Sequence, residues 1–178
     1  MAEEVSSTSS DSLELDVFGI AQDSIVDGPG LRFAIFVQGC ANGCPGCHNP
    51  ESHQYGCGTK YTVDDLVAMI ERNPLVKGVT ISGGEPFDQP EACAELAARL
   101  RADGYDIWVY TGYLLDDLLT RAQTDEAAKR LLENTNTLVD GPYIEDLASY
   151  DLKWRGSSNQ RIIENPMPLA SQIDQSDA

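Results

Sequence analysis

The stretch LRFAIFVQGCANGCPGCHNP, residues 31–50, joins a run of apolar residues to a loop that carries three cysteines within eight positions. The apolar run over 31–39 predicts a buried β-strand that leads directly into the loop. Glycine, asparagine and proline separate the cysteines, and these residues are typical of irregular backbone. The segment therefore predicts a strand whose carboxyl end presents three neighbouring thiols.

Strand-like and helix-like segments alternate along the rest of the chain. The strand-like runs are 78–84, 106–112 and 136–143, with a further candidate at 159–163, and the helix-like runs are 62–73, 91–103, 114–123 and 125–133. Such alternation is typical of parallel strands joined by helical crossovers. The units are too few for an eight-fold barrel, so we expect an α/β fold in the form of a partial (β/α) barrel with mainly parallel strands.

Polar or glycine-rich segments follow four of the predicted strands. They are the cysteine loop, SGGEP (82–86), YTGY (110–113) and VDGPY (139–143). Because the carboxyl ends of parallel strands meet at one edge of a sheet, we expect these segments to border one ligand site. Gly83 and Gly84 have no side chains, so a ligand can approach the backbone closely there.

Composition and charge indicate one domain between two tails. The chain has 178 residues, 42% of them hydrophobic, and a net charge of −17. We expect an acidic, disordered tail over 1–15, a folded domain over 16–165 and a second tail over 166–178. The negative charge argues against a nucleic-acid partner. The absence of a long apolar run or a signal-type N-terminus predicts a cytoplasmic protein without a membrane partner.

The cysteines Cys40, Cys44 and Cys47 follow the spacing C-x3-C-x2-C. Three thiolates can hold three irons of a four-iron cluster and leave the fourth iron open to an outside ligand. A zinc site with His48 or His53 as the fourth ligand is the main alternative, and a disulfide or an inert loop is another. An odd total of five cysteines in a reducing compartment argues against complete disulfide pairing.

Other conspicuous residues have simpler interpretations. We expect Cys93 to be a small core residue on the helix 91–103 and Cys57 to be an exposed loop thiol. His53 is expected at the surface or beside the site, and Trp108 in the core of a strand. For Asp140, a ligand contact and a capping role remain equally open.

Five segments together resemble a known family. They are DGPGLRFAIFVQGCANGCPGCHNPESH (27–53), ISGGEPF (81–87), IWVYTGY (107–113), LVDGPY (138–143) and WRGSSNQRII (154–163). The cysteine spacing followed by GGEP resembles the radical S-adenosylmethionine superfamily. GCPGC and RGSSNQ resemble, within it, the activating proteins of anaerobic ribonucleoside-triphosphate reductases, which are glycyl-radical activases of class III enzymes.

The resemblance implies cofactors and residue roles. Cys40, Cys44 and Cys47 would ligate a [4Fe-4S] cluster whose open iron binds S-adenosyl-L-methionine. The remaining contacts implied for this cofactor come from Gly46, Cys47, His48, Gly83, Gly84 and Glu85, with the Glu85 carboxylate a further candidate beside the backbone carbonyls. Reductive cleavage of the cofactor would give methionine and a 5′-deoxyadenosyl radical, which takes a hydrogen atom from a glycine of the partner reductase. No residue is assigned as a catalytic acid or base.

The same resemblance implies partners and leaves alternatives. The protein substrate would be the anaerobic ribonucleoside-triphosphate reductase, and the electron donor reduced flavodoxin or ferredoxin. Arg155 and the GSSNQ segment (156–160) are a candidate lid or docking loop, with a simple capped turn as the alternative. A pyruvate formate-lyase-type activase, a small-metabolite enzyme of the same superfamily and a non-enzymatic zinc- or cluster-binding adaptor remain as alternative functions.

Overall fold

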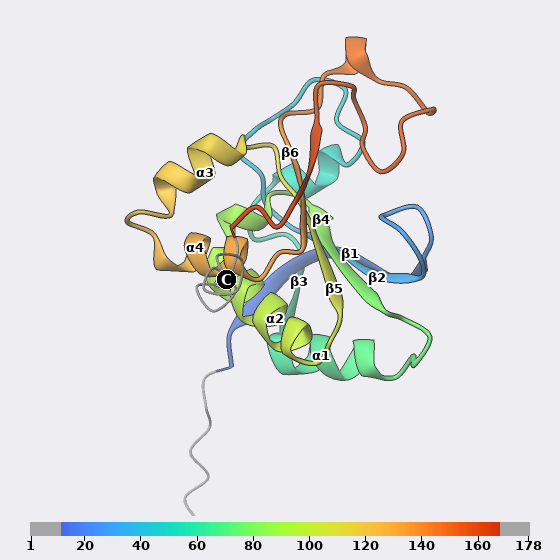
Figure 1. Ribbon diagram of the computed structural model, residues 1–178, viewed down its shortest axis with the longest axis vertical. Helices are drawn as coiled ribbons and strands as arrows, with labels where there is room; N and C mark the ends of the chain where they lie inside the picture. Colours follow the sequence, from blue (N-terminus) through green and yellow to red (C-terminus); the bar gives the residue numbers. More distant parts are fainter. Residues whose placement is uncertain (1–11, 168–178) are drawn as a thin grey trace, which may run out of the picture.

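The computed structural model describes residues 12–167, which form one mixed α/β layer structure (Figure 1). Its strands are β1 (Glu14–Ser24), β2 (Arg32–Val37), β3 (Thr59–Thr62), β4 (Gly78–Gly83), β5 (Asp106–Tyr110), β6 (Thr137–Asp140) and β7 (Arg161–Glu164). Its α-helices are α1 (Val63–Glu71), α2 (Pro90–Ala102), α3 (Leu115–Arg121) and α4 (Glu126–Glu133). Short 3-10 turns at Pro50–His53, Pro86–Asp88 and Glu145–Leu147 complete the described elements.

The strands form one sheet in the order β3-β1-β2-β4-β5-β6-β7. The central pairs β2–β4, β4–β5 and β5–β6 are parallel, which confirms the parallel core expected from the sequence. The outer pairs β1–β2, β1–β3 and β6–β7 are antiparallel. The candidate strand at 159–163 is therefore present as β7. It is the edge strand of the sheet and runs antiparallel to β6.

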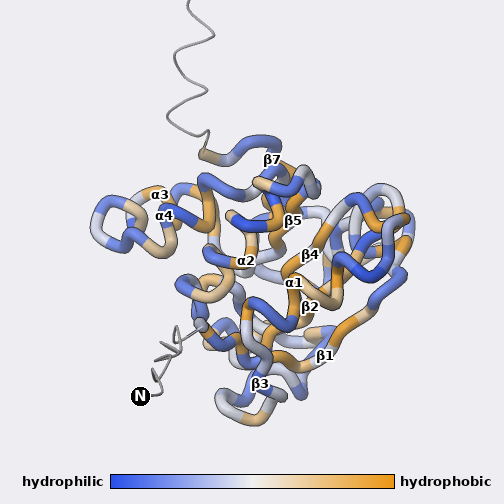
Figure 2. Tube along the Cα trace, turned by 90° about the horizontal axis from the view of Figure 1, so that it is seen from below, coloured by the Kyte–Doolittle hydropathy of each residue, from blue (hydrophilic) through white to orange (hydrophobic). Residues whose placement is uncertain are grey.

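The two faces of the central strands differ in chemistry because side chains alternate along a strand. Phe33 and Ile35 of β2, Val79 of β4 and Val109 of β5 belong to the apolar core. Their neighbours on the opposite face include Arg32, whose guanidinium donates to the Thr80 hydroxyl over 2.8 Å. Hydrophobic residues accordingly concentrate in β2, β4 and β5 (Figure 2). One face of the sheet therefore packs into the apolar core, and the opposite face carries polar and aromatic side chains.

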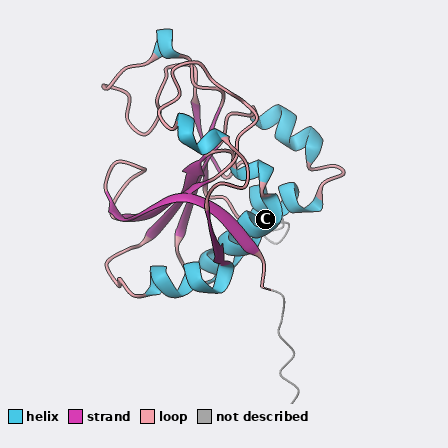
Figure 3. Cartoon of the chain, turned by 180° about the vertical axis from the view of Figure 1, so that it is seen from behind, coloured by secondary structure: helices cyan, strands magenta, loops and turns pink. Residues whose placement is uncertain are grey.

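Helices and loops lie on different sides of the sheet. The helices gather along one side, whereas the β1–β2 connection and the long β6–β7 connection lie away from them (Figures 1 and 3). Capping signals in the sequence set the helix starts. Thr62 and Asp65 form a reciprocal capping box at α1, and Pro90 is the first residue of α2, as expected.

The amino-terminal part of the sheet differs from the expectation. Strand β1 begins at Glu14, and Leu15 is fully buried, so both residues belong to the sheet and not to a tail over 1–15. The sheet gains β3 as well, because β1 pairs with it from Glu14↔Thr62 to Val17↔Thr59. Of the expected tails over 1–15 and 166–178, residues 1–11 and 168–178 lie outside the described residues.

Candidate functional site

A cavity of about 550 Å³ opens at the carboxyl ends of the central strands. Each of the four segments expected there contributes to its wall, with Cys40, Ser82, Thr111 and Tyr143 as one representative of each. The prediction that these strand ends border one site is therefore confirmed. The volume lies in the range of about 300–1,000 Å³ that is typical of sites for organic ligands.

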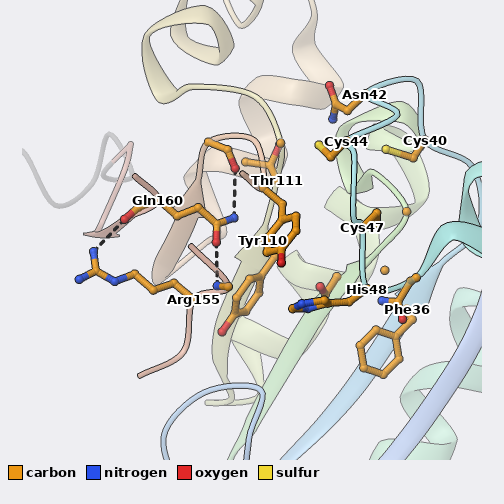
Figure 4. Close-up of a pocket in the computed structure, with 18 of the residues that line it drawn as sticks. Phe36, Cys40, Asn42, Cys44, Cys47, His48, Tyr110, Thr111, Arg155 and Gln160 are labelled. Atoms are coloured by element: carbon orange, nitrogen blue, oxygen red, sulfur yellow. Dashed lines mark hydrogen bonds between the residues drawn. The ribbon is translucent and has the colours of Figure 1, made fainter. Parts of the chain in front are cut away.

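The three clustered cysteines all face this cavity. Cys40, Cys44 and Cys47 line it together, and each is a free, half-buried thiol. Figure 4 shows their side chains on one loop, across the cavity from Arg155. Such a set of soft donors suits iron–sulfur or zinc chemistry.

The three thiols can be compared with the ligand requirements of a zinc ion and of a four-iron cluster. Within residues 12–167, no group of three or more His, Cys, Asp or Glu side chains is placed to hold one metal ion. A zinc ion requires its ligands to converge to about 2.0–2.3 Å from one point. A four-iron cluster binds one thiolate per iron, so its protein ligands stand apart from one another. Cys40, Cys44 and Cys47 could therefore each bind one iron of such a cluster.

Backbone contacts hold the first cysteine more firmly than the other two. The Gly39 amide donates to the Ser52 carbonyl over 2.7 Å, and the Cys40 amide donates to the His53 carbonyl over 3.1 Å. The Cys47 amide donates to the Cys44 carbonyl over 3.2 Å, which closes a local turn. Burial raises the pKa of the Cys40 thiol, and the neighbouring Glu85 carboxylate adds to that effect. A nearby positive charge, such as iron, would stabilise the thiolate of Cys40 there.

The paired glycines after β4 pack tightly against the cysteine loop. The Gly84 amide donates to the Val37 carbonyl over 2.7 Å, and a Cβ atom at Gly84 would overlap the Gly39 carbonyl. Gly83 has φ +95°, and a Cβ there would lie 2.5 Å from Phe36 Cα. Only glycine fits this close approach. Both glycines line the cavity, as the sequence predicted.

Two residues expected beside the cofactor do not line the cavity. Gly46 lies against the Glu145 carboxylate. Glu85 is fully buried, and its two carboxylate oxygens accept four hydrogen bonds from backbone and side-chain donors. Desolvation raises the pKa of Glu85 to about 7, although the hydrogen bonds from Gly112, Phe87 and Thr111 oppose the rise. The Glu85 side chain is thus a buried connector within the wall.

Aromatic residues complete the wall, among them His48, which the sequence singled out. His48 contacts Tyr143, with 4.7 Å between ring centroids and a tilt of 53°, and both rings line the cavity. The Tyr110 hydroxyl donates to the Trp154 carbonyl, and Trp154 packs edge-on against Trp108. Tyr143 ends the VDGPY segment that the sequence placed at the site, whereas Trp154 was included only in the WRGSSNQRII segment of the family resemblance. The role of Trp154 in the wall could not be inferred from that segment alone, because it depends on how the β6–β7 connection returns over the cavity.

A second hollow of about 500 Å³ continues from the cavity, and we call it the side groove. It lies between the β1–β2 connection, represented by Ile25 and Val26, and the β6–β7 connection, represented by Tyr150 and Leu152. Ile25 and Val26 are 73% and 74% exposed, and Tyr150 is fully exposed. His48 and Arg155 border both the cavity and the side groove. The site therefore has a lateral, partly apolar entrance.

The structure settles the remaining sequence interpretations. Cys93 is fully buried in the core and Cys57 is exposed, as expected. His53 borders the cavity, in agreement with a place beside the site. Asp140 is buried, accepts from the Leu115 amide at the start of α3 over 2.7 Å and pairs with Arg161, so its role is capping. Trp108 is buried, but on the cavity side of the sheet.

Arg155 and its neighbours form an internally bonded turn. The Arg155 Nη1 donates to the Gln160 carbonyl over 2.8 Å, and the Gln160 side chain accepts from the Gly156 amide over 2.8 Å. Figure 4 shows the guanidinium directed away from the cysteines. These local hydrogen bonds agree with the capped-turn interpretation. Arg155 also borders both the cavity and the side groove, so a docking role can be tested by substitution.

Comparisons with known proteins agree with this site. A family model described as a 4Fe-4S single cluster domain matches residues 26–163. The chain is 38% identical over 144 residues to the anaerobic ribonucleoside-triphosphate reductase-activating protein of Escherichia coli K12, covering 76% of this chain and 90% of that protein. The proteins of the same name from Vibrio cholerae and phage T4 are 35% and 32% identical, over 78% and 79% of this chain and 90% and 88% of theirs. The solved structure of QueE from Escherichia coli superposes with a TM-score of 0.42 at 18% identity, over 56% of this chain and 53% of that one, a partial likeness only.

The fold and the three cysteines thus define a single-cluster 4Fe-4S domain. Within this class, the chain belongs to the family of anaerobic ribonucleoside-triphosphate reductase-activating proteins. In residues 12–167, none of the helices has the length and apolar character needed to cross a bilayer.

Proposed function

We propose that the chain is a radical S-adenosylmethionine activase that generates a glycyl radical on an anaerobic ribonucleoside-triphosphate reductase. The observation that carries this proposal is the shared cavity. Three thiols and the paired glycines face it together, in a chain that spans 90% of a relative bearing the name of reductase activator. We further propose that the protein works in the cytoplasm, with reduced flavodoxin or ferredoxin as electron donor.

Three groups of residues that line the cavity would have different roles. Cys40, Cys44 and Cys47 would bind the cluster as thiolates and leave one iron for the cofactor. Gly83 and Gly84 would offer backbone groups to the methionine end of S-adenosylmethionine, because nothing but backbone faces the cavity there. The rings of His48 and Tyr143 are tilted by 53° to each other, and the flat face of either could stack on an adenine. When bound, the cluster supplies the electron that cleaves S-adenosylmethionine and so starts the radical chemistry.

The side groove supports a protein substrate over a free metabolite. Ile25, Val26 and Tyr150 expose apolar surface at a lateral entrance, where a small polar substrate would gain little. Exposed aromatic and aliphatic side chains around a groove are typical of protein-binding surfaces. The groove leads into the cavity, so a glycine-bearing loop of the reductase could reach the cofactor while the rest of the partner stays outside.

The proposal is tested by anaerobic reconstitution of the full chain with iron and sulfide. Reduction in the presence of S-adenosylmethionine should then give 5′-deoxyadenosine, and addition of the reductase should give a glycyl radical signal by electron paramagnetic resonance. Pyruvate formate-lyase serves as the matched protein substrate and should give no signal. A signal with pyruvate formate-lyase alone would move the assignment to the other activase class. Zinc in anaerobically prepared protein, with no cofactor cleavage, would overturn the enzyme assignment.

A further inference from the structure

Asn42 lies between the first two cysteines and lines the cavity with them. Its Nδ2 atom donates a hydrogen bond of 3.0 Å to Glu85 Oε2. Figure 4 shows Asn42 beside Cys40 and Cys44, on the same loop. An asparagine in a Gly-rich loop ordinarily bonds to its own local backbone. Asn42 instead joins its loop to a residue 43 positions further along the chain.

The acceptor of this bond is a buried carboxylate with no free bonding capacity. Glu85 Oε1 accepts from the Phe87 amide over 3.1 Å and from the Thr111 hydroxyl over 2.8 Å. Glu85 Oε2 accepts from the Gly112 amide over 2.9 Å as well as from Asn42. A carboxylate has about four lone-pair sites, so all are filled. Burying such a group without donors is unfavourable, so each donor matters to its position.

The main chain of Glu85 is attached to the same loop. Its amide donates to the Gly39 carbonyl over 2.8 Å, immediately before Cys40. Glu85 therefore contacts the cysteine loop on both sides of Cys40, through its backbone at Gly39 and through its side chain at Asn42. These two bonds fix the backbone around the first thiol.

Two further features of the wall depend on the same arrangement. A Cβ atom at Gly112 would overlap the side-chain amide of Asn42. Only glycine at position 112 therefore leaves room for Asn42 in this place. Asp88, three residues after Glu85, accepts from the Ala41 amide over 3.3 Å and from the Tyr113 hydroxyl over 3.0 Å. Glu85 and Asp88 thus contact the cysteine loop at Gly39, Ala41 and Asn42.

We infer that Asn42 is a positioning residue for the cluster, and that its bond to Glu85, the Asn42–Glu85 clamp, holds the cysteine loop in the form that receives the iron–sulfur cluster. This inference rests on the proposed function and deepens it, since it assigns the motif glutamate a role in the wall in place of a contact with the cofactor. Preorganised ligands bind a metal centre more tightly because less backbone freedom is lost on binding. The clamp should therefore slow release of the cluster.

The test compares Asn42→Ala with the wild-type chain after anaerobic reconstitution. We expect Asn42→Ala to release iron to a chelator about tenfold faster, because a hydrogen bond to a charged group is lost. The apoprotein should melt within roughly 4 °C of wild type, since a single hydrogen bond contributes little to a domain of this size. Asn134→Ala is the matched control, because Asn134 Nδ2 also makes one hydrogen bond, of 2.8 Å to Arg130, at the end of α4.

Two further variants separate positioning from general destabilisation. Gly112→Ala keeps both clamp residues but displaces the Asn42 amide, so it should speed iron release as Asn42→Ala does. In the double variant Asn42→Ala with Glu85→Gln, the effects on release should be less than additive, because both changes break the same bond. Additive effects, or a lower melting temperature with an unchanged release rate, would overturn the clamp.

The outcomes also distinguish this inference from the proposed function. If the wild-type chain takes up no four-iron cluster, the proposed function fails and the clamp fails with it. If the wild type binds the cluster and Asn42→Ala releases it at the wild-type rate, the clamp alone is wrong.

Discussion

The Tyr110 hydroxyl donates a hydrogen bond of 2.9 Å to the Trp154 carbonyl, and so ties the end of β5 to the long connection between β6 and β7. Trp154 has φ +58°, a left-handed conformation that is uncommon for a bulky residue. Burial raises the pKa of Tyr110, so its phenol remains a donor at neutral pH. This bond holds the outer wall of the cavity against the sheet.

Tyr110→Phe should loosen that wall without unfolding the domain. A neutral hydrogen bond contributes about 1 kcal/mol, so we expect amide hydrogen exchange in residues 144–157 to be about fivefold faster. Mass-spectrometric exchange of the full chain measures this directly. Tyr105→Phe is the control, because Tyr105 packs against the core at the other end of the strand. Equal exchange in both variants would show that Trp154 is held by packing alone.

The cysteines should divide into two groups on substitution. Alanine at Cys40, Cys44 or Cys47 should abolish retention of the four-iron cluster, because each removes one of three thiolate ligands. Alanine at Cys57 or Cys93 should leave iron and sulfide content unchanged, since neither thiol borders the cavity. Iron and sulfide analysis after reconstitution provides the measurement. Loss of the cluster in Cys57→Ala would add a fourth protein ligand and remove the open iron from the proposal.

The sequence was most informative where chemistry follows a strand. The cysteine loop, the paired glycines and the TGY segment could be placed at one site because parallel strands bring their carboxyl ends together. Helix α1 was predicted with its cap because the cap is local. The Thr62 side chain accepts from the Asp65 amide, and the Asp65 side chain accepts from the Thr62 amide. Local signals and a regular topology were sufficient for these parts.

Long-range pairing explains what the sequence did not reveal. Strand β1 reads as the end of an acidic tail, and only its pairing with β2 and β3 makes it a strand. Arg32 is a charged residue within the predicted buried strand, and bonds to Thr80 and to Asp106, which is 74 positions away, allow its burial. Glu85 was expected to face a cofactor, whereas its partners from another loop and strand turn it inward.

Arg155→Ala should impair activation of the reductase while leaving the cluster intact. The side chain borders both the cavity and the side groove but lies away from the cysteines. We expect the rate of glycyl radical formation to fall about tenfold, as for loss of one charged contact at an interface. Iron content provides the internal check, and Arg72→Ala, an exposed arginine after α1, is the control. Unchanged activation would leave Arg155 with its local bond to Gln160 only.

Tyr150→Ser should weaken association with the reductase. Tyr150 is fully exposed at the side groove, and truncation of an aromatic residue at the centre of an interface often costs about 2 kcal/mol or more. The reductase concentration for half-maximal activation should rise at least about tenfold, with cofactor cleavage in the absence of reductase unchanged. Leu75→Ser removes an exposed apolar side chain that precedes β4, at the end of this strand away from the cavity, and should have no effect. An equal response of both variants would contradict docking at the groove.

Glu85 should make the stability of the chain without its cluster depend on pH. The pKa of the buried carboxyl is raised from 4.5 to about 7, mainly by desolvation. Between these values the folded protein keeps a proton that the unfolded chain has lost. The free energy of unfolding therefore falls as pH rises from about 4.5 to about 7, and levels off above. At about 1.4 kcal/mol per unit, the total loss is roughly 3 kcal/mol.

Glu85→Gln isolates this contribution because glutamine has no proton to lose over this range. At low pH, where the carboxyl is protonated, wild type should hold its largest advantage over the variant, and that advantage should shrink by roughly 3 kcal/mol by pH 8. Urea denaturation of the two apoproteins at pH 5, 6, 7 and 8, under reducing conditions, measures the difference at each pH. Parallel profiles for the two proteins would mean that the Glu85 carboxyl loses its proton at the same pH in the folded and unfolded chains. Its four donors would then stabilise the ionised form enough to offset its burial completely.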